Sequence, residues 1–246
     1  MCGSHGGRYA GYLAARAGVR AVILNDAGVG LHAAGIGALP FCQSIGVTAA
    51  AVAYTSARIG DAEDMLAHGV ISYVNVAAAG IGVVAGVTCA RAAERLQDAP
   101  AADGECPDYE EARTVAGVNG HGLRIVCVDS VSLVADADAG HIVVSGSHGG
   151  VVSGQRGLAI RVAAAAAFYN DAGIGKDEAG VSRLPVLDER SIAAATVDTA
   201  TARIGDGLST LEDGILSRVN ATAAALGMRP GMSARDAVER VRPPTI

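Results

Sequence analysis

Ser147-His148-Gly149-Gly150, followed by Asn170-Asp171-Ala172-Gly173-Ile174-Gly175-Lys176-Asp177, is the stretch that decides the fold of this 246-residue chain. Most of it occurs twice. The earlier occurrence is Ser4-His5-Gly6-Gly7 and then Asn25-Asp26-Ala27-Gly28-Val29-Gly30. Ser147 follows Ser4 by 143 residues, and Asn170 follows Asn25 by 145 residues. The sequence therefore predicts an internal duplication in which two residues were gained or lost once, between the two motifs.

Two later motifs repeat at the same separation of 145 residues. Ala57-Arg58-Ile59-Gly60-Asp61 returns as Ala202-Arg203-Ile204-Gly205-Asp206, and Val74-Asn75 returns as Val219-Asn220. The constant separation argues against chance matches, and it indicates that both halves have one fold.

Short apolar runs without alternation, such as Val47 to Tyr54 and Ile192 to Val197, are typical of parallel strands covered on both faces. Strand and helix signals alternate, which predicts a mainly parallel α/β sheet. We expect two homologous β-α-β-α-β-α-α repeats related by a pseudo-twofold axis. Residues 1–97 form the first repeat, residues 98–140 a connector with a strand pair, and residues 141–246 the second repeat.

Several elements can be assigned within this plan. Strands are expected at Ala21 to Leu24, Ala164 to Tyr169, Leu123 to Val128 and Val131 to Val134, and a polar surface connector at Asp98 to Asn119. Helices are expected at Tyr9 to Ala17 and Leu158 to Val162, with short helices broken at Leu39-Pro40 and Leu184-Pro185. Final helices begin at Thr88 and Ser233, whose hydroxyls can cap them.

The stretch after each Arg-Ile-Gly-Asp motif has apolar residues about four apart, which predicts a longer amphipathic helix. In the second copy these residues are Leu211, Ile215, Val219, Ala223 and Leu226, and in the first they are Leu66, Val70, Val74, Ala78 and Ile81. Asn75 and Asn220 would then lie on the buried side of these helices and satisfy backbone groups.

The second copy opens with a buried strand, His141 to Gly146, where the first copy has only Met1-Cys2-Gly3. Two explanations are equally compatible with this difference: the first copy lacks its first strand, or the start of the chain lies downstream of the true start.

Composition excludes several classes of partner. A net charge of −6 without a basic run argues against nucleic acid. The longest apolar run, Val74 to Cys89, is too short for a membrane span and is interpreted as a buried helix. No signal peptide is visible, and the five cysteines lack CxxC spacing, which favours a reduced, cytoplasmic setting. The metal-ligand patterns HxH, HxxxH and HExxH are absent, so we expect no metal and no cofactor; a metal held by His5, His148 and the paired aspartates is an alternative that the sequence does not signal.

The repeated motifs follow predicted strands, and ligands of open α/β sheets bind at that edge. A site near the axis between the repeats is therefore expected. The glycines are interpreted as turn and close-packing residues. The Ser-His-Gly-Gly turn would place backbone N–H groups at a helix N-terminus, which suits an oxyanion. The alternative is that Ser147 caps a helix while His148 packs beneath it.

Lys176 is the only lysine of the chain, and it lies in the most motif-like stretch. Its spacing does not fit a Walker phosphate loop. The first copy has Leu31-His32 where the second has Lys176-Asp177, so the two copies differ where chemistry demands unlike groups. A buried lysine near Ser147 could lose its proton and activate the hydroxyl. Lys176→Met is then expected to abolish turnover, whereas Leu31→Met does little.

Arg58 and Arg203 have two interpretations: local pairing with Asp61 and Asp206, which cap the following helix, or binding of a substrate carboxylate or imide oxygen. His68, His121 and His141 lack ligand spacing and are interpreted as ordinary surface or packing residues.

These residues predict an enzyme, a hydrolase that cleaves a C–N bond of a small polar amide or imide, cyclic ones included. The repeated Ser, Lys and Arg groups are similar in logic to the ring-opening hydrolases of the cyanuric acid hydrolase and barbiturase type, whose repeat is threefold and whose motifs are absent here. A metabolite-binding or sensory protein, and a lyase or isomerase with Lys176 as base, are the alternatives. The partner is a small molecule, and a homo-oligomer is left open.

The expected catalytic residues are Ser147, His148, Lys176 and Asp171. The expected substrate-binding residues are Ser4, His5, Asn25, Asp26, Arg58, Asn170, Asp177 and Arg203.

Overall fold

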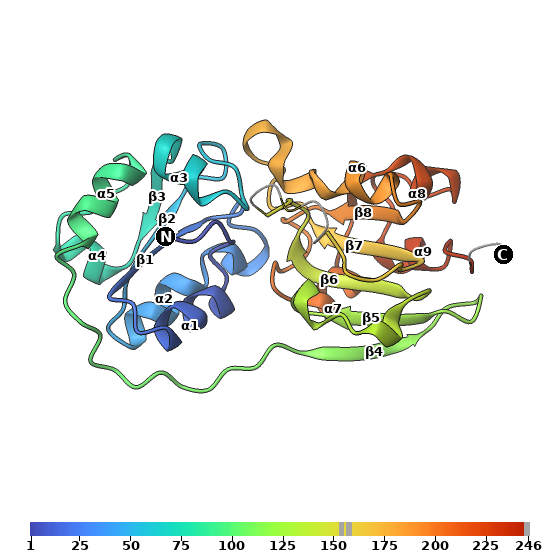
Figure 1. Cartoon of the computed structure of the whole chain (residues 1–246), viewed down its shortest axis with the longest axis horizontal. Coiled ribbons are helices and arrows are strands. Elements are labelled where there is room, and N and C mark those ends of the chain that lie inside the picture. Colours follow the sequence, from blue (N-terminus) through green and yellow to red (C-terminus); the bar gives the residue numbers. More distant parts are fainter. Residues whose placement is uncertain (153–154, 156–158, 244–246) are drawn as a thin grey trace. The chain divides into compact units, whose positions relative to one another are not determined.

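A computed structural model describes residues 1–152, 155 and 159–243 (Figure 1). The chain is mixed α/β with a three-stranded and a six-stranded sheet. It divides into two compact units. Unit 1 comprises Met1–Glu110 and Ala172–Ala179, and unit 2 comprises Glu111–Asp171 and Gly180–Ile246. Within the described residues, no helix is long and apolar enough to cross a membrane.

The sheet of unit 1 has the order β1-β2-β3, with β1 parallel to β2 and β3 antiparallel to β2. Its strands are β1 (Ala21–Asn25), β2 (Thr48–Val52) and β3 (Ile71–Val74). Its helices are α1 (Arg8–Arg16), the 3-10 helix η1 (Leu31–Ile36), α2 (Ala38–Ser44), α3 (Ala62–His68), α4 (Val76–Gly80) and α5 (Cys89–Leu96). The 3-10 helix η5 (Lys176–Val181) begins in the segment of the second half that belongs to this unit.

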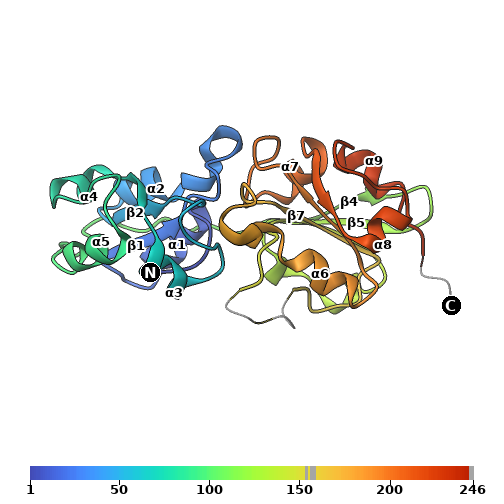
Figure 2. The same cartoon turned by 90° about the horizontal axis from the view of Figure 1, so that it is seen from above.

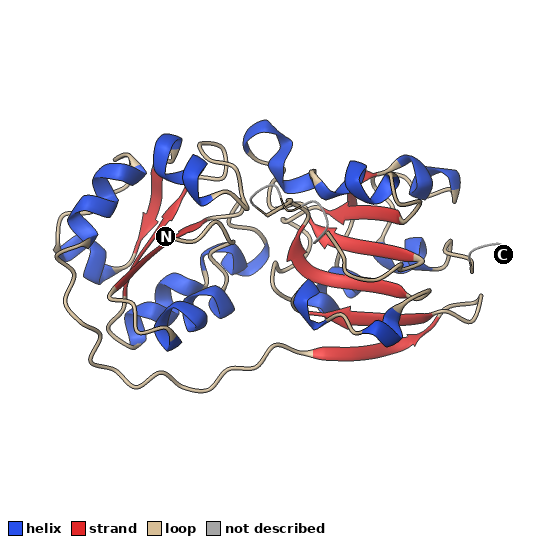
Figure 3. Ribbon diagram, viewed as in Figure 1, coloured by secondary structure: helices blue, strands red, loops and turns tan. Residues whose placement is uncertain are grey.

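Both faces of this sheet are covered, as the unbroken apolar runs predict. Val22 and Leu24 pack with Phe41 and Cys42 of α2 in one buried cluster. Ile23, between them in sequence, packs on the other face with Met65 of α3 and residues of α4 and α5. Figure 3 shows helices on either side of the three red strands.

The sheet of unit 2 has the order β4-β5-β6-β7-β8-β9, parallel from β5 to β8 and antiparallel at both edge pairs. Its strands are β4 (Arg113–Val118), β5 (Arg124–Val128), β6 (Ile142–His148), β7 (Ala166–Asn170), β8 (Ala193–Val197) and β9 (Leu216–Val219). Its helices are η2 (Val131–Leu133), η3 (Asp136–Asp138), α6 (Arg183–Asp188), α7 (Gly207–Glu212), α8 (Ala221–Ala225) and α9 (Ala234–Val238). Figure 2 shows α6 on one side of this sheet and α7 and α9 on the other.

The long amphipathic helix predicted after each Arg-Ile-Gly-Asp motif is wrong. Each stretch is a short helix, an antiparallel strand and a second short helix: α3, β3 and α4 in unit 1, and α7, β9 and α8 in unit 2. α3 ends at His68, and at the next residue, Gly69, a Cβ atom would lie 2.4 Å from the Met65 carbonyl oxygen. Val74 to Cys89 is correspondingly not one buried helix, because only Val76–Gly80 of its interior is helical.

Asn75 and Asn220 are therefore not within helices but cap α4 and α8. Asn75 Oδ1 accepts hydrogen bonds from Ala78 N and from Ala49 N of β2, and its amide donates to Val47 O. The predicted role in satisfying buried backbone groups is confirmed, and α4 and α8 begin directly after these two side chains.

Four further predictions differ from the structure. Val131 to Val134 contains the 3-10 helix η2 rather than a strand, and the expected surface connector contains the edge strand β4. Residues 159–162 are not helical, and Leu158 lies outside the described residues. Leu39-Pro40 does not break a helix: Pro40 lies in the first turn of α2, where a missing N–H costs no hydrogen bond.

Candidate functional site

Ser147 and His148 are the last two residues of β6, at the carboxyl edge of the parallel strands, and both are buried. Ser147 Oγ accepts a hydrogen bond from Val131 N at 2.9 Å. His148 Nδ1 accepts one from Gly150 N at 3.1 Å. Because Nδ1 is the acceptor, the neutral imidazole carries its proton on Nε2, which makes His148 a hydrogen-bond donor rather than a base there.

The corresponding turn of unit 1 has the same local geometry. His5 Nδ1 accepts a hydrogen bond from Gly7 N at 3.1 Å, and burial lowers the pKa of His5 to about 4. His5 is therefore neutral at pH 7. Ser4, which precedes it, is bound through its backbone: its carbonyl oxygen accepts from Asn25 N at 3.0 Å.

The glycines of these turns are close-packing residues, as predicted. A Cβ atom on Gly6 would lie 2.5 Å from Gly35 O, and one on Gly149 would lie 2.5 Å from Gly180 O. Gly28 and Gly173 have φ angles of 75° and 74°, a region that side chains disfavour.

The Asn-Asp pair of unit 1 organises the loops that follow β1 and β2. Asn25 donates to Ala57 O at 3.2 Å and accepts from Ala27 N at 2.9 Å. Asp26 accepts from Tyr54 N at 2.9 Å and from Ser72 Oγ at 2.8 Å. Burial raises the pKa of Asp26, and these hydrogen bonds only partly oppose the rise.

In unit 2 the same pair ends β7. Asn170 donates to Ala202 O at 3.1 Å, as Asn25 does to Ala57 O. Asp171 Oδ1 accepts from Thr199 N at 3.0 Å. Both side chains are buried and lie on the same sheet edge as Ser147 and His148. The structure thus brings together four of the predicted site residues in unit 2.

Local pairing of the arginines, one of the two interpretations above, is observed in both units. Arg58 Nη2 lies 3.3 Å from Asp61 Oδ2, and Arg203 Nη2 lies 2.8 Å from Asp206 Oδ2. Both aspartates cap the next helix: Asp61 accepts from Asp64 N, and Asp206 accepts from Ser209 N.

Asp64 is a functional candidate that the sequence analysis missed. Its carboxylate is fully buried and accepts a hydrogen bond from Arg58 N at 2.7 Å. Arg58 Nη2 and His68 Nδ1 lie 3.0 Å and 3.1 Å from Asp64 Oδ1. His68, expected to be an ordinary surface residue, therefore belongs to this charged cluster. Burial raises the pKa of Asp64, but the hydrogen bond from Lys176, the Arg58 N–H and the charges of both cations together hold it below its ordinary value.

Lys176 completes the cluster, although it is 112 residues from Asp64 in the sequence. Its Nζ lies 2.8 Å from Asp64 Oδ1 and 3.1 Å from Asp64 Oδ2. The backbone N–H of Lys176 donates to Tyr54 O at 2.9 Å. The neighbouring Asp177 pairs with Arg58 at 3.2 Å. Lys176 is thus held in an ion pair with a buried carboxylate of the same unit.

A sequence signal for Asp64 does exist. The matching position of the second copy is Ser209, and His68 matches Asp213. There Ser209 Oγ accepts from Arg203 N at 3.0 Å and donates to Asp213 at 2.7 Å. The copies thus differ at Asp64 and Ser209 as well as at Lys176 and Leu31.

Arg183, at the start of α6, is a second residue that the sequence analysis missed. Its guanidinium is buried and donates to Gly150 O at 2.8 Å and to Ala159 O at 2.9 Å. It lies 5.0 Å from the centre of the Tyr169 ring. No carboxylate of the described residues pairs with it, so a positive charge is buried next to the Ser147–Gly150 turn. The first copy has Ala38 at this position.

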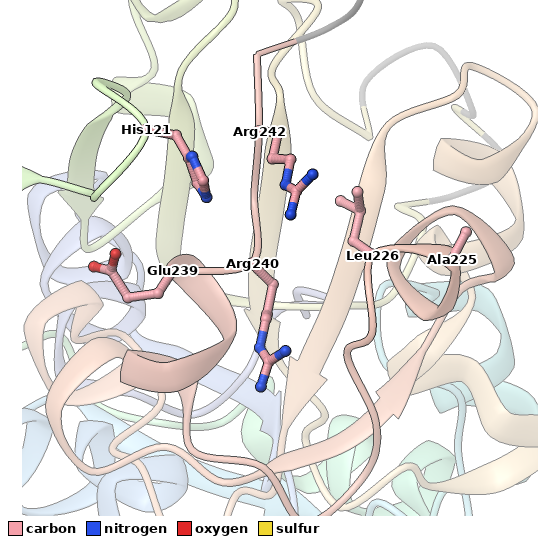
Figure 4. A pocket seen from close by; sticks show the side chains of 6 residues that line it. All are labelled: His121, Ala225, Leu226, Glu239, Arg240 and Arg242. Atoms are coloured by element: carbon pink, nitrogen blue, oxygen red, sulfur yellow. The ribbon is translucent and has the colours of Figure 1, made fainter.

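A cavity of about 480 Å³ lies at the opposite, amino-terminal edge of the parallel strands (Figure 4). Its lining includes His121, Leu226, Glu239, Arg240 and Arg242. Glu239 Oε2 accepts a hydrogen bond from Gly120 N at 2.8 Å. None of the repeated motifs contributes to it, so it is separate from the candidate site.

Among the described residues, no group of three or more His, Cys, Asp or Glu side chains is arranged to hold a metal ion. Comparisons with protein-family models, curated proteins and solved structures found no match to this chain.

Proposed function

We propose that this chain is a hydrolase that cleaves a C–N bond of a small polar amide or imide, with its reaction centre at the carboxyl edge of the unit 2 sheet. The observation that carries the proposal is the concentration of groups that favour negative charge at one turn. Ser147, His148 and Arg183 are all buried there, and Arg183 lacks a carboxylate partner among the described residues.

Each group has a defined role. The Ser147 hydroxyl already accepts a hydrogen bond from Val131 N, so its own proton is the one it can give. His148 is a donor through Nε2, because Gly150 N occupies Nδ1. Donors fixed before reaction stabilise the oxygen that becomes negative when a nucleophile adds to an amide carbonyl. The buried Arg183 charge acts in the same direction.

Hydrolysis adds water across the C–N bond and gives a carboxylate and an amine. Water is the nucleophile, and we assign Asp171, on the same sheet edge, as the group that takes a proton from it and returns that proton to the leaving nitrogen. Asn170 and Asp171 also fix the loop that follows β7, which positions the substrate. Asn170 and Arg203 remain proposed substrate-binding residues of unit 2, and Ser4, His5, Asn25, Asp26, Arg58 and Asp177 remain proposed substrate-binding residues of unit 1.

We further propose that the two halves are homologous repeats. Two pairs of equivalent hydrogen bonds support common descent. Gly7 N donates to His5 Nδ1 as Gly150 N does to His148 Nδ1, and Asn25 Nδ2 donates to Ala57 O as Asn170 Nδ2 does to Ala202 O.

The experiment is incubation with a panel of linear and cyclic amides and imides, with detection of released ammonia or ring-opened acid. Ser147→Ala and His148→Gln are expected to lower turnover by about 100-fold or more, as losses of oxyanion donors do. Val152→Ala, at an exposed position, is the control. Full activity in Ser147→Ala, or no turnover of any amide, would contradict the proposal.

One observation favours a second candidate, a metabolite-binding protein without turnover. Lys176, the expected base, is held by Asp64 in an ion pair. A binding protein would show ligand-induced thermal stabilisation with an amide that is recovered unchanged. Ser147→Ala separates the two, because loss of turnover with binding retained supports the hydrolase. Loss of turnover in Lys176→Met supports the lyase or isomerase alternative, in which Lys176 is the base.

A further inference from the structure

Arg240 and Arg242, two arginines that follow α9, carry charges that no described residue neutralises. Both are exposed, and among the described residues neither guanidinium takes part in an ion pair or a hydrogen bond. Elsewhere in unit 2, by contrast, Arg203 pairs with Asp206. Both Arg240 and Arg242 line the cavity of about 480 Å³ at the amino-terminal edge of the parallel strands. Two uncompensated positive charges therefore line one cavity.

The matching positions of unit 1 show that the local fold does not require these charges. Arg95 precedes Arg240 by 145 residues, and its guanidinium donates to Gly82 O. The Arg240 guanidinium makes no such hydrogen bond within the described residues. At the same separation, Arg242 corresponds to the uncharged Gln97. The pair of unbound charges is thus particular to unit 2, and the capping and packing of the helix do not explain it.

A third polar group, the ring of His121, lines the cavity from the turn between β4 and β5. This turn is fixed to the end of α9, because Asn119 Nδ2 donates to Val238 O and to Val241 O at 2.9 Å each. Among the described residues, the His121 ring makes no hydrogen bond, and a neutral imidazole always carries one N–H donor. Figure 4 shows the Arg242 guanidinium turned toward the space between His121 and Leu226. The donors are therefore positioned before any ligand binds.

The rest of the lining leaves the cavity positively charged and gives it one apolar wall. Glu239 Oε2 accepts a hydrogen bond from Gly120 N, and Glu239 forms no ion pair with either arginine. Two arginines and one glutamate give these side chains a net positive charge. Leu226, which follows α8, supplies the apolar wall together with the last residue of that helix.

We propose that this cavity binds a small molecule that carries a dianionic phosphate group next to an apolar body. Guanidinium groups bind phosphate through paired N–H donors, and their two charges match those of a phosphate monoester. The His121 ring donates a further hydrogen bond, and Leu226 packs against the apolar body. The volume of about 480 Å³ suits a small metabolite. This inference does not depend on the proposed hydrolase activity, whose reaction centre is at the opposite edge of the sheet.

The test is a titration of the full ¹⁵N-labelled chain with phenyl phosphate, in a low-salt buffer without phosphate, followed by amide NMR. The expected result is saturable chemical shift changes at Gly120, His121 and Leu226. Benzoate, which has the same ring and a single negative charge, should bind about tenfold more weakly. Inorganic phosphate, which lacks the apolar body, should shift the same amide signals with lower affinity than phenyl phosphate. Shifts that do not saturate, or benzoate binding as tight as that of phenyl phosphate, overturn the proposal.

Protein variants locate the site. Arg240→Gln and Arg242→Gln should each lower the affinity for phenyl phosphate about tenfold or more, because each removes a charged donor. Arg91→Gln removes an exposed arginine of α5 in unit 1 and is the control, with unchanged affinity. Glu239→Gln removes the negative charge and keeps an oxygen that can accept from Gly120 N, so its affinity should exceed that of the wild type.

Circular dichroism shows that each variant is folded before its affinity is compared. Wild-type affinity in the double variant Arg240→Gln/Arg242→Gln overturns the proposal, as does an equal loss of affinity in Arg91→Gln. Weaker binding by folded Glu239→Gln than by the wild type also overturns it, because removal of a negative charge cannot weaken an anion site that works by charge.

Discussion

Replacing Lys176 with methionine removes the ammonium that lies 2.8 Å and 3.1 Å from the two oxygens of Asp64. The Asp64 carboxylate is fully buried, whereas the Lys176 side chain is 23% exposed. Hydrogen bonds to a charged group contribute about 1.5–3 kcal/mol. Arg58 still pairs with Asp64 in the variant, so the carboxylate keeps one cation. We expect the free energy of unfolding to fall by about 2 kcal/mol.

The assay is urea unfolding at pH 7 of the wild type, Lys176→Met, Asp64→Asn and the double variant. Residues in direct contact have coupling energies of about 0.5–3 kcal/mol. We expect about 1–2 kcal/mol here. Glu63→Gln, which removes an exposed carboxylate of the same helix, should change stability by no more than about 0.5 kcal/mol.

The pH dependence has a definite sign. The pKa of Asp64 is lowered in the folded protein, so its contribution is fully present above the unfolded-state value. It is lost as pH falls through the folded-state pKa. The difference between wild type and Lys176→Met should therefore shrink in acid. A coupling energy within about 0.3 kcal/mol of zero at pH 7, or a difference that grows in acid, would refute the ion pair as a source of stability.

Three further predictions concern packing, caps and thiols. Gly149→Ala should destabilise the chain by about 1–3 kcal/mol in urea unfolding because its Cβ would lie 2.5 Å from Gly180 O. Gly80→Ala is the control: it lies in helix α4 with nothing within 4 Å of its Cβ, so it should not destabilise the chain. Asn220→Ala should lower the free energy of unfolding by about 2–4 kcal/mol, since it removes the cap of α8 and the hydrogen bonds with Ala194 N and Ile192 O. A loss below about 1 kcal/mol would show that only the cap contributes. Burial raises the pKa of Cys127 to about 12, so iodoacetamide at pH 8 should label exposed Cys2 first in mass spectrometry and reach Cys127 only on unfolding.

The sequence predicted those elements whose signals are local. The strands at Ala21–Asn25, Thr48–Val52 and Ala193–Val197 were visible as unbroken apolar runs, because a strand covered on both faces needs apolar residues at every position. The hydroxyl caps at Thr88 and Ser233 were also predictable, because each cap accepts a hydrogen bond from a backbone N–H only three residues away.

The failed helix after Asp61 and Asp206 shows the limit of periodicity. Apolar residues four apart satisfy a helix, but a spacing of four is also a multiple of the two-residue repeat of a strand. The strands β3 and β9 form because β2 and β8 offer them an antiparallel edge, which no local pattern records. Gly69, which follows the end of α3, and Asn75, which caps the start of α4, were the local signals of the interruption that the apolar spacing did not reveal.

The repeated motifs and several of the strands could be predicted from the sequence alone, because each depends on neighbours within a few positions or on direct comparison of the two halves of the sequence. The partners of those residues were decided only by the tertiary structure. Lys176 meets Asp64 across 112 residues. Arg183 lies beside Gly150 because the start of α6 is bound to the turn after β6 by the hydrogen bond from Arg183 N to Gly149 O. Charge pairs of this kind depend on the path of the chain, and electrostatic attraction has no sequence period by which it could be recognised.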